Sequence, residues 1–142
     1  MGSFQVDDSR WPLVFAKVQG TLNDEETKAW FAAQGRSLER GERFATVVDC
    51  TELEQWTAKH RAANVAFLKG CGPTMGKLLV GCGLAMRNPV IRGAATAMSW
   101  ISPFPHPIKY VATVAEAEAY ARAQLAAAGI RVPAVGSKET AT

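Results

Sequence analysis

The sequence predicts an α/β domain whose helices cover the faces of a largely parallel sheet. Strand-like and helical segments alternate along the 142 residues with short connections, which is typical of strand–helix–strand units. A chain of this length can form one domain with a sizeable core. We therefore expect a single domain over residues 1–130, with a mixed, mostly parallel sheet of about five strands and about four helices. A polar, mobile tail is expected over residues 131–142.

An antiparallel hairpin is expected at the N-terminus. Phe4–Val6 and Leu13–Val18 are apolar runs on either side of a polar turn at Asp7–Ser9. Two such runs around a turn indicate paired strands. The hairpin would add an antiparallel edge to the sheet.

A helix and a central strand follow. Asn23 and Glu26 form a capping box, in which each side chain satisfies a backbone N–H of the other residue, and the helix is expected to end before Gly41. The run Phe44–Cys50 is almost continuous in apolar and β-branched residues. This composition predicts a strand that is covered on both faces.

The next helix is expected over about Thr57–Lys69, because glycine and proline in Gly70–Pro73 break a helix. One more helical turn or two are expected at Met75–Val80, followed by an inner strand at Gly81–Met86. The glycines at the start of that strand lack the third glycine of a dinucleotide-binding fingerprint. We expect them to let a helix approach the strand closely.

The helix expected at residues 89–101 is the least usual element. Asn88 is its cap, and Pro89 occupies the first helical position, where proline is favoured. Apolar residues surround more of this helix than one core-facing stripe requires, and Arg92 is its only charged residue. Such a helix is either a core helix held between the sheet and the following proline-rich loop, or it faces a partner, a ligand or a lipid surface.

The last part of the chain predicts one more strand and one more helix. Ile108–Ala112 has the composition of a short strand. Thr113 and Glu116 form a second capping box, and the alanine-rich helix that follows is expected to end at Gly129.

Charge is unevenly distributed along the chain, whose net charge is +3. Residues 1–54 contain ten acidic and six basic side chains. Residues 55–115 contain seven basic side chains and no acidic ones. Either one face carries a positive potential, or folding intermixes the segments and the field is diffuse. The seven cations are Lys59, Arg61, Lys69, Lys77, Arg87, Arg92 and Lys109.

Composition argues against several classes of protein. Three cysteines and two histidines without ligand spacing predict no metal site and no cofactor. Cys50 and Cys82 lie in apolar runs and are expected to be small core residues in a reducing, cytoplasmic setting. No apolar run approaches the ~18 residues of a transmembrane segment. The basic residues are too sparse for a surface that follows nucleic-acid phosphates, so no nucleic-acid partner is expected.

No catalytic motif is complete. The run GCGPTMGK at residues 70–77 lacks the spacing of a phosphate-binding loop and precedes a strand. Asp49 resembles a phospho-acceptor at a strand end, but the acidic partners for Mg²⁺ are missing, and we expect it to cap the following turn. Cys50 and His60 have no third orienting group, and a buried cysteine and a solvated histidine are expected.

Four stretches together resemble the SpoIIAA-like (STAS/Sec14-type) domain family. They are VFAKVQGTLNDEE, FATVVDCTEL, GLAMRNPVIRG and IKYVATVAEAEAYA, and the resemblance covers roughly residues 4–128. It implies a mixed sheet with helices packed around it. It also implies a non-enzymatic regulator, such as an anti-sigma-factor antagonist, a component of a signalling complex, or a domain that holds a small or lipid-like ligand.

The antagonist branch of that family carries an Asp-Ser pair where the helix after the central strand begins. Here Gln55-Trp56-Thr57 occupies that place, so Thr57 is the only hydroxyl available for phosphorylation and the preceding acid is missing. A phosphate at a helix N-terminus is electrostatically favourable. Without the motif, a plain helix cap is the preferred interpretation of Thr57.

We therefore expect a non-enzymatic regulatory or adaptor module that binds a protein partner. Its contact face is expected at Arg87, Arg92, Trp100, Phe104 and His106, because arginines beside a helix N-terminus favour an acidic partner surface, a phospholipid head group or a phosphate. The alternative is a protein that binds a small apolar ligand or a lipid in a pocket under the 89–101 helix. An exposed apolar helix would also be compatible with a two-fold homodimer.

Overall fold

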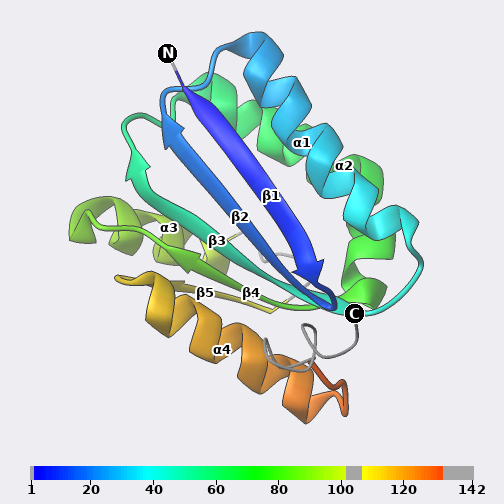
Figure 1. Cartoon of the computed structure of the whole chain (residues 1–142). Helices are drawn as coiled ribbons and strands as arrows, with labels where there is room; N and C mark the ends of the chain where they lie inside the picture. Colours follow the sequence, from blue (N-terminus) through cyan, green and yellow to red (C-terminus); the bar gives the residue numbers. More distant parts are fainter. Residues whose placement is uncertain (1, 102–106, 133–142) are drawn as a thin grey trace.

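The computed structural model describes residues 2–101 and 107–132, and for residues 98–101 it describes the backbone alone. Within these residues the chain forms a five-stranded sheet in the order β1-β2-β3-β4-β5, with β1 and β2 antiparallel and the other neighbours parallel (Figure 1). The expected α/β domain with a mixed sheet and four helices is confirmed. The expected tail lies mostly outside the described residues. The elements are β1 (Ser3–Arg10), β2 (Leu13–Gly20), α1 (Asp24–Glu39), β3 (Phe44–Leu53), α2 (Ala58–Leu78), β4 (Leu79–Ala85), α3 (Pro89–Ile101), β5 (Ile108–Val111) and α4 (Val114–Ala127).

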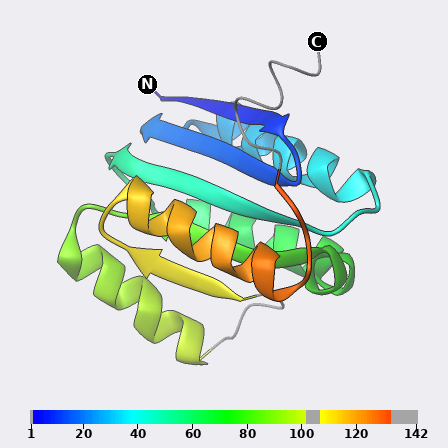
Figure 2. The ribbon, with the colours of Figure 1, turned by 60° about the horizontal axis from the view of Figure 1, so that its bottom comes forward.

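Helices cover the two faces of the sheet unequally. Successive side chains of a strand point to opposite faces, so Val14 and Val18 of β2 belong to the core under α1 and α2, whereas Leu13 belongs to the core under α4. Figure 2 shows α4 in front of the middle of the sheet, with β1 and β2 extending beyond it. Among the described residues, no helix covers the face of β1 and β2 on the α4 side, which we call the open face.

A close approach between β4 and α4 fixes the second core. A Cβ atom built at Gly83 would lie 2.2 Å from the carbonyl oxygen of Ala117. Ala117, Ala121 and Leu125 of α4 are fully buried against the sheet. The expectation that a glycine at this strand admits a helix is confirmed.

The N-terminal hairpin turns later than expected. Residues 7–9 belong to β1, and the turn lies at Trp11 and Pro12, where the N–H of Trp11 donates to the Asp8 carbonyl oxygen at 3.0 Å. The prediction of a turn at Asp7–Ser9 was therefore wrong. Polar residues can continue β1 because most of this edge strand is exposed to solvent.

α2 is continuous through the run in which we expected a break. It includes Gly70–Pro73 and ends at Leu78, so the prediction of a helix ending near Lys69 was wrong. Proline removes one backbone hydrogen bond within a helix, but Pro73 is exposed and water can solvate the carbonyl left unpaired. The buried Met75 anchors the second half of the helix on the core.

β3 also runs further than expected, to Leu53, because a β-bulge keeps its polar end in the sheet. Lys17 pairs with Asp49 but Gln19 pairs with Glu52, so β3 carries one extra residue over this interval. Asp49 stabilises the bulge, since its Oδ1 accepts hydrogen bonds from the backbone N–H of Thr51 at 2.9 Å and from the Thr51 hydroxyl at 2.6 Å. Asp49 is a local cap, as expected.

Candidate binding surface

The N-terminus of α3 is built as the sequence predicts. The side-chain oxygen of Asn88 accepts hydrogen bonds from the backbone N–H groups of Val90 at 2.9 Å and Ile91 at 3.3 Å. Pro89 is the first residue of the helix, where a missing N–H costs nothing. The cap fixes where α3 begins after β4.

The structure brings Arg87 and Arg92 to this corner and gives them different roles. The Nη1 atom of Arg92 donates a hydrogen bond to the Met86 carbonyl oxygen at 3.0 Å, so the half-buried side chain of Arg92 folds back onto the chain after β4. Arg87 is exposed and has no hydrogen bond or ion pair with any described residue. Arg92 therefore supports the corner, and Arg87 is the cation that can meet a partner.

The described part of α3 exposes an apolar surface. Val90 is 79% exposed and Ile91 is 47% exposed. Because these apolar side chains are exposed, the interpretation of α3 as a core helix is wrong for residues 89–97. Arg92, the only charged residue of this stretch, is half-buried. The side chain of Trp100 and the whole of Phe104 and His106 lie outside the described residues. The exposed residues between 89 and 97 are Pro89, Val90, Ile91, Gly93, Ala94 and Ala97.

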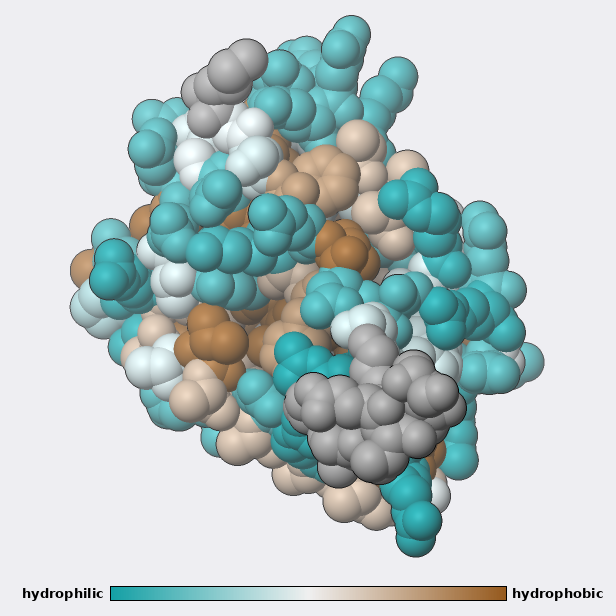
Figure 3. Space-filling view, in the orientation of Figure 1, coloured by the Kyte–Doolittle hydropathy of each residue, from teal (hydrophilic) through white to brown (hydrophobic). Residues whose placement is uncertain are grey.

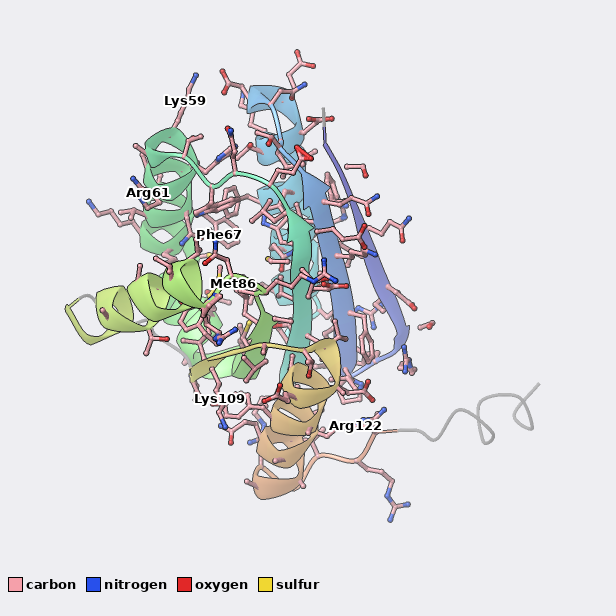
Figure 4. The ribbon with its side chains drawn as sticks, turned by 90° about the vertical axis from the view of Figure 1, so that its left-hand side faces the viewer. Lys59, Arg61, Phe67, Met86, Lys109 and Arg122 are labelled. Atoms are coloured by element: carbon pink, nitrogen blue, oxygen red, sulfur yellow. The ribbon has the colours of Figure 1, made fainter. Side chains whose placement is uncertain are left out.

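We call the exposed residues Arg87, Val90, Ile91 and Ala94 the α3 corner. The helix packs beside β5 at the edge of the sheet, and Figure 4 shows α3 on the left of the molecule and β1 on the right. An apolar surface of this kind next to an exposed cation can recognise a ligand or partner that combines an apolar centre with a negative charge.

Strand order converts the uneven charge of the sequence into uneven charge in space. Because the strands lie in chain order, the basic segment forms α2, β4, α3 and β5 on one side of the molecule. Figure 4 shows Lys59 and Arg61 of α2 above Met86, and Lys109 of β5 below it. Among the described residues, Lys59 is the only one of the segment's seven cations in a salt bridge, and its partner is Asp24. The separated-charge interpretation is therefore favoured over intermixing.

Thr57 caps α2 with an unusual partner. The Thr57 hydroxyl accepts a hydrogen bond from the His60 backbone N–H at 3.3 Å, and His60 Nδ1 accepts one from the Thr57 N–H at 2.9 Å. The ring proton is therefore on Nε2, which donates to the Leu22 carbonyl oxygen at 2.8 Å. Thr57 is a helix cap, as preferred, and its phosphorylation stays a prediction. His60 is only 7% exposed, so the expectation of a solvated histidine was wrong.

Cys82 is buried and Cys50 is half-buried, and both lack the features of nucleophiles. Burial raises the pKa of Cys50 to about 12 and that of Cys82 to about 11, which keeps both thiols protonated near neutral pH. No group of three or more metal-ligating side chains forms within residues 2–101 and 107–132. None of the helices there is long and apolar enough to cross a membrane.

Sequence reasoning missed two surface hollows, and neither lies under α3. One is on the open face beside α4, and the other lies between β1 and α1. The alternative of a ligand pocket beneath α3 gains no support from them. The signal for the open face was the alternation in β2, where the partly exposed Phe15 and Lys17 interleave with the buried Val14 and Ala16.

Comparison with known proteins establishes the fold. No protein-family model and no curated protein match the sequence. An uncharacterised protein of the DUF3478 family from Shewanella loihica, described as having a SpoIIAA-like fold, has a TM-score of 0.67 and 13% identity over 85% of this chain and 95% of its own. An anti-sigma factor antagonist from Mycobacterium paratuberculosis has a TM-score of 0.59 and 18% identity over 86% of this chain and 95% of its own. This chain has a SpoIIAA-like fold.

Proposed function

We propose that this protein is a non-enzymatic regulatory or adaptor module that binds a partner protein through the α3 corner. The observation that carries the proposal is Val90, a large apolar side chain that is 79% exposed beside Arg87, which has no ion pair with any residue that the structure describes. The similarity of the fold to an anti-sigma factor antagonist, whose role is in regulation, supports the same class of function.

The side chains of the α3 corner indicate which kind of partner surface they can bind. Complete burial of a valine or isoleucine side chain contributes roughly 1.5–3 kcal/mol, so Val90 and Ile91 are suited to be central anchors. Arg87 can then form a charge-assisted hydrogen bond at the rim. The basic segment around the corner would attract a negatively charged surface over a longer range. We infer a partner with an apolar centre bordered by carboxylates.

A matched pair of double variants tests the proposal. Arg87→Glu/Val90→Asp reverses the charge and removes the apolar anchor at the α3 corner. Lys69→Glu/Val65→Asp makes the same chemical changes at exposed positions of α2. Affinity capture from the lysate of the native cell, followed by mass spectrometry, compares both variants with the wild type. All three proteins are first required to unfold cooperatively.

The proposal predicts a protein captured by the wild type and by the α2 variant but lost with the α3 variant, and captured less at higher salt. A partner captured equally by the α3 variant would show that the α3 corner is not the binding surface. Light scattering of the purified proteins identifies the case in which the partner is a second copy. Self-association would then depend on Val90 in the same way.

A further inference from the structure

The open face of the sheet contains a hollow that the proposed protein-binding surface does not use. It lies between the N-terminal hairpin, β3 and the start of α4, and its cavity volume is about 220 Å³. Figure 3 shows apolar surface between the polar side chains in the middle of this view. The residues that line the hollow are Gln5, Asp7, Phe15, Ala16, Lys17, Val47, Asp49 and Val114.

The hollow has an apolar floor and a charged rim. Phe15 and Val47 are adjacent on paired strands, and both belong to or pack against the core under α4. Val114, the first residue of α4, closes one side. Asp7, Lys17 and Asp49 supply the charges. A few polar groups around an apolar floor are typical of small-molecule sites.

The β-bulge in β3 determines how these charges are paired. Residues three apart in a regular strand point to opposite faces, but the extra residue places Glu52 on the same face as Asp49. Glu52 then forms the salt bridge with Lys17 and holds the pKa of Lys17 above its ordinary value. Lys17, which is paired with Asp49 across the two strands, is thereby engaged by a different carboxylate.

Within residues 2–101 and 107–132, Asp49 has one carboxylate oxygen without a donor. Its Oδ1 is occupied by Thr51, and the half-buried side chain has no salt bridge among the described residues. A partly buried carboxylate is stabilised by a cation that reaches it directly. The guanidinium of Arg10 lies 3.8 Å from the centre of the Phe15 ring, and Arg10 is not among the residues that line the hollow.

We propose that this hollow binds a small organic cation, a primary ammonium group carried on a short apolar or aromatic body. The ammonium group donates to the free oxygen of Asp49, and the body lies against Phe15, Val47 and Val114. Sites for drug-sized ligands measure roughly 300–1,000 Å³, so the ligand is smaller than those. The site belongs to the acidic half of the molecule and is independent of the α3 corner.

Two probes of matched shape test the inference. Phenethylammonium chloride carries the cation, and 2-phenylethanol replaces it with a neutral hydroxyl group. Each is titrated into the ¹⁵N-labelled protein while backbone amide shifts are recorded. Phenethylammonium should give saturable shifts at residues lining the hollow, with a dissociation constant of about 1 mM or lower. Loss of one charge-assisted hydrogen bond should make the alcohol roughly 10- to 100-fold weaker.

Variants of equal charge change provide the control. Asp49→Asn keeps an oxygen for Thr51 and should lose binding, whereas Asp8→Asn, on the other face of β1, should not. Val114→Phe should fill the hollow and reduce the affinity for both probes.

The inference is overturned by shifts that do not saturate below about 10 mM, by shifts confined to other surfaces, or by equal binding of the two probes. Unchanged binding of phenethylammonium by Asp49→Asn would also overturn the inference. If that variant does not fold, the comparison of the two probes on the wild type decides alone.

Discussion

The substitution Gly83→Ala places a methyl group against the backbone of α4. The new Cβ would lie 2.2 Å from the carbonyl oxygen of Ala117 and 2.7 Å from its carbonyl and α carbons. Restoring ordinary contact distances requires the helix to move by roughly 1 Å, which loosens the fully buried Ala121 and Leu125. Overpacking of a core typically costs 1–3 kcal/mol. Because backbone must yield here, we expect a loss of about 3 kcal/mol in the free energy of unfolding.

Urea denaturation followed by circular dichroism measures this loss, provided that the slope with denaturant is unchanged. The midpoint of thermal unfolding should fall by roughly 6–12 °C. Two glycines serve as controls. In Gly81→Ala the nearest atoms are Cγ and Cβ of Gln124, at 2.6 and 2.7 Å, and not backbone atoms, so this substitution should cost about 1–2 kcal/mol, less than Gly83→Ala.

Gly35→Ala, in α1 with no atom near its Cβ, should stabilise by up to about 1 kcal/mol through helix propensity. A free energy of unfolding for Gly83→Ala within about 0.5 kcal/mol of the wild type would contradict a backbone clash with α4, and so would an equal loss in Gly81→Ala.

Two further predictions concern buried polar groups. His60→Gln keeps an acceptor for the Thr57 N–H and should lower the free energy of unfolding by about 1 kcal/mol. His60→Leu leaves that N–H and the Leu22 carbonyl oxygen unpaired and should lower it by about 3 kcal/mol. Equal losses of the two variants in urea denaturation would contradict the cap geometry. Burial raises the pKa of Cys82 from 9.0 to about 11. As pH rises, the unfolded chain therefore releases this proton before the folded protein does. The free energy of unfolding should then fall by about 2–3 kcal/mol as pH rises from 9 to 11. The decline between pH 9 and 11 should be shallower in Cys82→Ala than in Cys71→Ala, and parallel declines would refute the assignment.

Local signals in the sequence were sufficient for much of the fold. Asn23 and Asn88 cap helices as predicted, because capping depends on residues three positions apart. Gly83 was identified as a point of close approach. The break expected before Pro73 did not occur, since the buried Met75 holds the rest of α2 on the core. Tertiary packing outweighs local propensity there.

The candidate sites could be predicted from the sequence only in part. The α3 corner could be located, but the outward exposure of Val90 depends on α3 lying at the edge of the sheet, which the pattern of apolar residues does not specify. The hollow depends on the bulge that brings Glu52 to the face of Asp49. Such a one-residue change of register has no distinct sequence signal, because it is set by the pairing of two strands.

The order of the strands has a consequence for synthesis of the protein on the ribosome. Each strand pairs with the strand that precedes it in the chain, so the sheet can grow in the direction of translation without waiting for a later segment to insert. The exception is the face covered by α4, the last element. Leu13 and Val47 are buried with this helix, and a nascent chain keeps them uncovered until residue 127 has emerged. The hydrophobic face left open during translation is then a natural target for chaperones.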